Sequence, residues 1–208
     1  MRNATRTETT RALLLQAARH EFAEHGIAGA RVDRIAERAG VNKQRIYAHF
    51  GDKEQLFRYV VVQALNELSQ AVTVTDDHDP AAYVARCFDY HREHPDLLRL
   101  LLWESLHYGN ARLPAEEERA ELYDAKVASL SDALGDTAPV PDSRQLLLTL
   151  IGLAVWPQIT PQIARLVLGP DAATDTEQER LRAFLVDFTR TALGHPPAVA
   201  GCPSATDS

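Results

Sequence analysis

Apolar residues recur with the period of an α-helix along almost the whole chain, and no stretch alternates as a half-buried strand would. The pattern is clearest in residues 32–50. Its first apolar residues fall at i, i+3, i+4 and i+7, and they are Val32, Ile35, Ala36 and Ala39. This spacing predicts a short helix with one buried face, and the chain as a whole is predicted to be all-α.

A tight turn and a second short helix are predicted directly after it. Gly40 can adopt the positive φ that ends a helix, and Asn42 offers a side-chain oxygen to cap the next one. Ile46 and Phe50 share the inner face of that helix, and the small Ala36 allows the two helices to cross closely. The pattern is typical of a helix-turn-helix. The outer face of its second helix carries Lys43, Gln44, Arg45, Tyr47 and His49.

Helices are predicted on both sides of this motif. Thr9 or Thr10 can cap a preceding helix that Gly26 ends. Asp52 and Gln55 have the spacing of a capping box at the start of a long fourth helix, which we expect to link the head to the rest of the chain.

Further helices are predicted beyond an acidic break at residues 73–80. Their ranges are 81–94, 96–108, 116–134 and 143–156. Pro157 and Pro161 kink the last of these or separate a short helix from it. The final helix is predicted to start at Thr176, with Glu179 completing a second capping box.

The predicted domains follow from this order of helices. Residues 1–57 form a three-helix helix-turn-helix head, and residues 58–194 form a larger helical body. Residues 195–208 are rich in Pro, Gly and Ala and are expected to form a disordered tail.

Charge is unevenly divided between these parts. The chain of 208 residues has a formal net charge of −7, which by itself argues against a nucleic-acid partner. Residues 1–57, however, hold ten Lys and Arg against seven Asp and Glu, whereas the remainder holds twelve against twenty-two. A mildly basic head on an acidic body suits contact between the head and phosphate groups.

The start of the chain is polar and shows no signal peptide, so a cytoplasmic location is expected. Its longest apolar run, residues 146–156, is about half of the ~20 residues that span a bilayer. The two cysteines, Cys87 and Cys202, have no metal-ligand spacing, and no cofactor is expected.

The head resembles the TetR family of transcriptional regulators over roughly residues 10–57. The matching residues are Leu14-Leu-Gln-Ala-Ala18, Phe22, Gly26, Val32-x-x-Ile35-Ala36, Ala39-Gly-Val41, Ile46-Tyr47-x-x-Phe50 and Lys53-Glu54-x-Leu56. The resemblance implies an all-α homodimer whose last two long helices pair with those of the partner in a four-helix bundle. It also implies a repressor that releases its DNA when a small molecule enters the body.

The resemblance also assigns roles in the head. Gln44 and Arg45 are expected to reach base edges, since Arg matches guanine and Gln matches adenine in bidentate pairs. Tyr47 and His49 are expected at phosphates, with Lys43 and Lys53 adding charge to the backbone contacts. The alternative for this set of residues is a solvated helix face without a role in binding. For His49 a second alternative is a partly buried structural histidine, which would give the same sequence pattern.

One departure from the family lies before the helix that begins at Val32. The family usually has a hydroxyl cap there, and this chain has Ala30-Arg31, which weakens the cap by about 1 kcal/mol. We expect Arg31 to take over the contact with phosphate.

A dimer would have two recognition helices, so the operator is expected to be a near-palindrome with half-sites at least ~34 Å apart. Residues 146–156 are apolar on all sides and need cover on all sides, which a partner subunit can supply. The alternative is a helix at the centre of the monomer.

Five of the chain's fourteen aromatic residues lie between residues 83 and 108, and they could line a cavity for an apolar or planar ligand. Most are expected to be core, with two or three facing a pocket. The residues predicted to bind an effector are Tyr90, Trp103, Glu104, His107, Tyr108 and Trp156.

Two smaller features have alternative explanations. His91 and His94 have a spacing that zinc can use, but no third ligand is evident and no metal site is predicted. Cys87 is either a redox sensor or, as is more usual for a single cysteine on an apolar helix, a small core residue.

Three functions remain open at this point. The leading one is a dimeric repressor released by a small molecule, with ligand in the body tilting the fourth helix and changing the separation of the heads. The second is a constitutive DNA-binding regulator or activator without a ligand. The third is an enzyme that uses His91, His94, Glu104 or His107, although the chain shows no nucleophile motif or phosphate loop. We therefore predict a non-enzyme that binds DNA.

Overall fold

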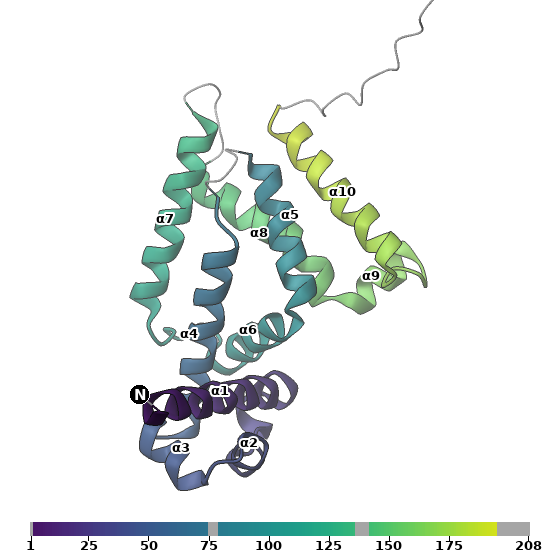
Figure 1. Cartoon of the computed structure of the whole chain (residues 1–208). Helices are drawn as coiled ribbons and strands as arrows, with labels where there is room; N and C mark the ends of the chain where they lie inside the picture. The colour runs from purple at the N-terminus through teal and green to yellow at the C-terminus, as the bar shows by residue number, and fades with distance from the viewer. Residues whose placement is uncertain (1, 75–78, 136–141, 195–208) are drawn as a thin grey trace, which may run out of the picture. The chain divides into compact units, whose positions relative to one another are not determined.

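The computed structural model describes residues 2–74, 79–135 and 142–194, and within them every regular element is an α-helix (Figure 1). The helices are α1 (Arg2–Gly29), α2 (Val32–Ala39), α3 (Lys43–Phe50), α4 (Lys53–Ala71), α5 (Pro80–Glu93), α6 (Pro95–Tyr108), α7 (Glu116–Leu134), α8 (Ser143–Ile159), α9 (Pro161–Leu168) and α10 (Asp175–Ala192). The predicted all-α class is confirmed. The predicted tail, residues 195–208, lies outside the described residues.

The helices fall into two compact units. The first contains the described residues up to Thr73 together with Asp89–Ala125, and the second contains Val74–Phe88 together with the described residues from Lys126 onward. This grouping does not test where the head ends, so the division at residue 57 stays a prediction.

The first unit has its core between α1, α2, α4 and α6. Phe22 of α1 and Phe57 of α4 are fully buried, and their rings meet edge to face with centroids 5.1 Å apart. The apolar stripes of α2 and α4 are buried against α1, as their spacing predicts. Helix α6 packs against both α1 and α4.

The start of α1 differs from the prediction. The helix begins at Arg2 rather than at a cap on Thr9 or Thr10, because residues 2–8 contain no glycine or proline that would stop it. Gly26 interrupts the helical geometry as expected, with φ 65° and ψ −177°, but helical turns resume and end at Gly29.

The second unit contains α8, α9 and α10. Helix α8 continues through Pro157 to Ile159, and the bend of 85° falls before Pro161, where the proline ring disfavours helical geometry at Thr160. The cap of α10 is Thr174, whose hydroxyl accepts the N–H of Glu177, rather than the predicted Thr176. Both threonines precede an acidic residue by three positions, so the local pattern does not distinguish them.

Among the described residues, no single helix has the length and apolar composition to span a membrane, and α8 with α9 meets the test only as a bent pair.

Candidate nucleic-acid interface

Helices α2 and α3 form the predicted helix-turn-helix, and local signals determine its turn. Gly40 adopts φ 64° and ψ 31°, and its N–H together with that of Val41 closes the end of α2 onto Ala36 and Glu37 carbonyls. The Asn42 side chain accepts the N–H of Gln44 at 2.9 Å, which caps α3. The turn therefore fixes the direction in which α3 leaves α2.

The outer face of α3 does not pack against the core of the first unit. Ile46 is buried, whereas the side chains predicted to meet bases and phosphates are exposed, namely Gln44, Arg45, Tyr47 and His49. The rest of the first unit thus supports one side of α3 and leaves the other side open to a groove.

The two predicted lysines already have partners within the chain. The Lys43 Nζ atom lies 2.8 Å from an Asp33 carboxylate oxygen, and this hydrogen bond raises the pKa of Lys43. Lys53 donates to the carbonyl oxygens of Ala28 and Ala30 at 3.4 and 3.2 Å. Both ammonium groups tie neighbouring helices together, and each retains further N–H capacity for a phosphate.

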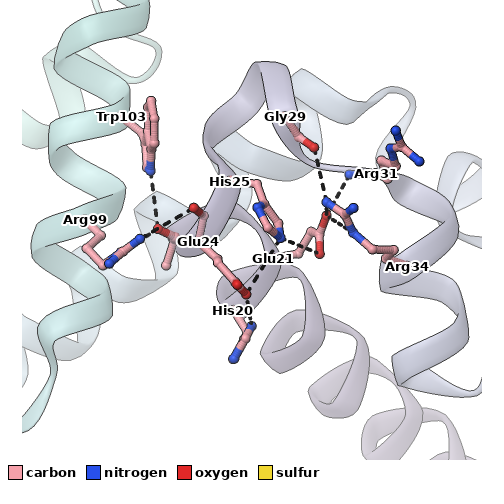
Figure 2. A network of polar contacts seen from close by, with 10 residues as sticks. His20, Glu21, Glu24, His25, Gly29, Arg31, Arg34, Arg99 and Trp103 are labelled. Atoms are coloured by element: carbon pink, nitrogen blue, oxygen red, sulfur yellow. Dashed lines mark hydrogen bonds and ion pairs between the residues drawn. The ribbon is translucent and has the colours of Figure 1, made fainter.

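The start of α2 has a partner that the sequence did not reveal. The Arg31 side chain makes no cap and is exposed, as the missing hydroxyl predicts. Instead, Glu21 of α1 accepts the Arg31 backbone N–H and the Arg34 Nε–H, each at 2.8 Å (Figure 2). Arg34 also donates to the Gly29 carbonyl at 3.2 Å. A carboxylate from another helix therefore organises the N-terminal end of α2.

Glu21 is only 5% exposed, so its charge depends on these hydrogen bonds. Burial opposes its ionisation, but the hydrogen bonds from Arg34 and from the Arg31 N–H outweigh burial and lower the pKa of Glu21. One signal in the sequence could have identified it. Glu21 lies three and four residues after the buried Ala18 and Ala17, so it interrupts the apolar face of α1 with a charge.

Helix α6 holds the kink in α1. Arg99 donates to the Ala23 carbonyl at 2.7 Å, and Trp103 donates to the same oxygen through its indole N–H at 3.3 Å (Figure 2). The Trp103 indole lies directly over Gly26, where a Cβ atom would come within 2.6 Å of its ring. The absence of a side chain at Gly26 therefore permits both the kink and this contact.

The other predicted effector residues of α6 also have partners in the first unit. Glu104 and Arg119 are both buried and form a bidentate pair with N–O distances of 2.8 and 2.9 Å. Tyr108 donates to Glu54 of α4 at 3.1 Å, and burial followed by this bond raises the pKa of Tyr108 to about 12. His107 lies 3.9 Å from the same carboxylate.

The remaining two predicted effector residues, Tyr90 and Trp156, lie outside α6. The Tyr90 ring packs 4.4 Å from the ring of His94 in the first unit, and Trp156 is an exposed residue of α8 in the second unit. The structure thus brings Trp103, Glu104, His107 and Tyr108 together on one helix, and their role in effector binding stays a prediction.

Neither metal nor redox chemistry gains support from the described residues. Within them, no group of three or more His, Cys, Asp or Glu side chains could hold a metal ion, and His91 is buried. Cys87 is also buried, and burial raises its pKa to about 12, so it stays a thiol at neutral pH.

Comparisons with known proteins agree with this geometry. Residues 14–60 match the family model described as bacterial regulatory proteins of the tetR family, and residues 79–191 match the model described as the C-terminal domain of tetracyclin repressor-like proteins. The HTH-type transcriptional repressor SCO4008 of Streptomyces coelicolor is 44% identical over 181 residues, which cover 84% of this chain and 92% of that protein.

Solved structures show the same arrangement of helices. The putative transcriptional regulator SCO4942 of Streptomyces coelicolor aligns with a TM-score of 0.74 and 34% identity, over 90% of this chain and 99% of that chain. FadR of Bacillus subtilis, solved with stearoyl-CoA, aligns with a TM-score of 0.60 and 18% identity over 85% and 97% of the two chains, which shows a common fold. Two family models match the chain, and SCO4008 is related to it over most of its length. Together with the exposed outer face of the helix-turn-helix, these matches show that the chain belongs to the TetR family of DNA-binding transcriptional regulators.

Proposed function

We propose that the protein is a homodimeric repressor that binds a near-palindromic operator and releases it when a small apolar or aromatic molecule binds the body. The expected location is the cytoplasm, where such an operator would lie. Repression is supported by the names of relatives, which include the repressors SCO4008 and NicS. The observation that carries the dimer is an uncovered apolar surface in the second unit.

This surface, the α8/α10 surface, is defined by two pairs of large exposed side chains. On α8 they are Leu148 and Trp156, exposed by 73% and 57%, and on α10 they are Phe184 and Phe188, exposed by 63% and 48%. The two phenylalanine rings stack with centroids 6.1 Å apart, so they form one continuous apolar stripe. Helices α8 and α10 contact each other within the unit. Large apolar side chains exposed on two contacting helices favour burial against another protein surface.

A second copy of the chain is the occupant that we propose. It would pair α8 and α10 with their symmetry mates and give the dimer a two-fold axis. Two copies of α3 would then read two half-sites, with Gln44 and Arg45 on bases. The phosphate contacts would come from Arg31, Lys43, Tyr47, His49 and Lys53.

Measuring the mass of the protein in solution tests the surface. We expect a dimer for the wild type and a monomer for the double variant Phe184→Glu with Phe188→Glu. Leu166→Glu is the matched control, because Leu166 is an exposed apolar residue of α9 that lies outside the defined surface. A dimer that survives the double substitution would refute the proposed interface.

Selection of bound fragments from genomic DNA tests the reading of sequence. We expect a shared near-palindrome with the wild type and its loss with Arg45→Ala. Arg58→Ala is the control, since Arg58 is an exposed cation on α4 and is not among the residues predicted to contact DNA. Fragments without a common sequence, unchanged in Arg45→Ala, would favour a regulator that binds DNA without base readout.

Release by an effector has support from the position of α6. Trp103 and Tyr108 connect α6 to α1 and α4 within the first unit, so a molecule that engages them would have to break contacts that hold the head. FadR shows that this fold can accommodate a small molecule. Effector and operator should then weaken each other's binding by the same factor. Equal affinity of an effector for free and operator-bound protein would contradict release.

A further inference from the structure

A hollow lies between α1 and α3, beside the predicted recognition surface. It encloses about 230 Å³, and its apolar wall is formed by Leu14 of α1 and by Ile46 and Phe50 of α3. Leu14 and Ile46 are buried, so this wall belongs to the core of the head and is held in place by it. The hollow is therefore part of the folded head, and Val41 of the turn between α2 and α3 completes its apolar lining.

Its rim carries three basic side chains from two helices. Arg45 and His49 stand one turn apart on α3, and Arg11 approaches from α1. Among the described side chains that line the hollow, none is a carboxylate. Arg11 and Arg45 also form no ion pair with any acidic side chain in the described parts of the chain. Within the described side chains, the rim is thus a positive site that no carboxylate neutralises.

Arg11 is held in position by Tyr59 of α4. Its Nη2 atom donates to the Tyr59 hydroxyl at 2.5 Å, and its guanidinium carbon lies 5.3 Å from the centroid of the Tyr59 ring. The same ring packs edge to face on Phe50, with centroids 5.3 Å apart. A guanidinium has five N–H groups, so several remain available for a ligand while its plane is already fixed.

We propose that the hollow receives one phosphodiester of the operator backbone and that Arg11 is a DNA-contact residue. This inference rests on the proposed binding of operator DNA by α3. A helix in the major groove has a sugar–phosphate backbone along each flank. Arg45 and His49 lie on the flank of α3 that borders the hollow, and Arg11 of α1 borders the same hollow. An Arg fork matches a phosphate in a bidentate pair, and the apolar wall suits the deoxyribose beside it.

The dependence of operator affinity on salt tests the proposal. Each phosphate neutralised by a protein cation contributes about 0.9 to the slope of log K against log salt concentration. Arg11→Ala should therefore reduce the slope by about 2 in a dimer with two copies of the site, and reduce affinity about tenfold or more near physiological salt. Arg11→Lys keeps the charge, so it should keep the slope while losing affinity through the lost fork.

Two controls separate contact from folding. Arg58→Ala removes an exposed cation of α4 and should leave the slope unchanged. Tyr59→Phe removes only the hydroxyl that orients Arg11, so it should weaken affinity without changing the slope. Thermal unfolding of each variant shows whether the head remains folded.

DNA in which single phosphates are replaced by neutral methylphosphonates locates the partner. One replacement in each half-site should weaken the wild type and leave Arg11→Ala unaffected. An unchanged slope for Arg11→Ala on an operator that the wild type binds would overturn this proposal alone. If the wild type selects no common sequence, the proposed function is refuted, and this inference, which rests on it, is refuted as well.

Phenyl phosphate distinguishes the backbone from a small phosphate ester as the source of the ligand. We expect no measurable binding of phenyl phosphate to the DNA-free protein in the millimolar range. Tight binding that Arg11→Ala abolishes, together with an unchanged salt slope on DNA, would assign the hollow to a small molecule and overturn the assignment to the operator.

Discussion

Gly26 offers the sharpest test of how α6 positions the head. Its φ of 65° with ψ of −177° is a conformation that essentially only glycine adopts, and forcing another residue into it costs about 1–3 kcal/mol. A Cβ atom would also stand 2.6 and 2.7 Å from two carbons of the Trp103 indole. Displacing a packed ring in this way adds about 1–3 kcal/mol. Gly26→Ala should therefore lower the free energy of unfolding by about 2–6 kcal/mol in total.

Thermal and urea unfolding followed by circular dichroism measure this loss. For a chain of this size, each kcal/mol lowers Tm by about 2–4 °C, so a decrease on the order of 10 °C is expected. Gly29→Ala is the matched control, because Gly29 is helical and its added Cβ would meet only the His25 Cβ at 3.4 Å. That variant should be neutral or slightly more stable, since alanine favours a helix over glycine by about 0.5–1 kcal/mol.

A double variant separates the cost of backbone strain at Gly26 from the cost of displacing the Trp103 indole. In a Trp103→Ala background the indole is gone, so Gly26→Ala should cost only the backbone part of about 1–3 kcal/mol. Wild-type stability of Gly26→Ala, or the same cost with and without the indole, would refute the account of the Trp103 contact.

Three further predictions concern buried charges and the thiol. Glu104→Ala leaves the Arg119 guanidinium buried without its partner and should cost about 3–5 kcal/mol in urea unfolding, whereas replacing both residues by leucine should recover most of it. Glu21→Gln should be less stable than the wild type at pH 7. Because the pKa of Glu21 is lowered from its usual 4.5 in the folded state, this difference should be full above that value and be lost progressively as pH falls from it through the lower folded-state pKa, and a pH-independent difference would contradict the role of its charge. In a Cys202→Ser background, iodoacetamide at pH 8 should leave Cys87 unmodified in the folded protein and modify it in urea. The pKa of about 12 also predicts that Cys87 lowers stability between pH 9 and 12, because the thiol ionises there only in the unfolded chain, and Cys87→Ala should make the fall of stability in this range less steep.

The helix-turn-helix could be predicted closely because each of its signals acts over a few residues. Gly40 ends α2 through its own φ, and Asn42 caps α3 through an N–H two residues away. The capping box of Asp52 and Gln55 is equally local, with the Gln55 N–H bound at 2.7 Å. Such features depend on residue type and spacing, and a single sequence displays both.

Helix ends were predicted less well where the local signals are ambiguous or missing. Thr174 and Thr176 offer the same cap pattern, and the chain uses the first. Asn3, Thr5 and Thr7 are as capable of a cap as Thr9 and Thr10, and α1 begins at Arg2, before all of them. Propensity and spacing cannot rank alternatives that satisfy them equally.

The long-range contacts were outside the reach of periodicity. Arg99 and Trp103 reach the Ala23 carbonyl across 76 and 80 positions, and Tyr108 reaches Glu54 across 54. A helical pattern indicates which face is buried and does not identify the partner. The aromatic residues of α6 could therefore be recognised as partly buried and chemically useful, while their contact with the head could not.

That contact changes how the predicted effector residues have to be understood. Trp103 and Tyr108 cannot keep their bonds to Ala23 and Glu54 and at the same time give the same N–H and O–H groups to a bound molecule. If an effector uses them, its binding free energy must exceed the loss of these bonds, and the head loses part of its support in the same step. If it does not, α6 serves as a fixed brace of α1 and the effector site lies elsewhere. Trp103→Phe bears on these cases, because it removes the indole N–H that bonds to Ala23 and keeps an aromatic ring on α6, while the smaller ring also gives up part of the contact with Gly26. A loss of effector affinity with unchanged operator affinity would favour direct contact, whereas weaker operator binding with unchanged effector affinity would favour the brace.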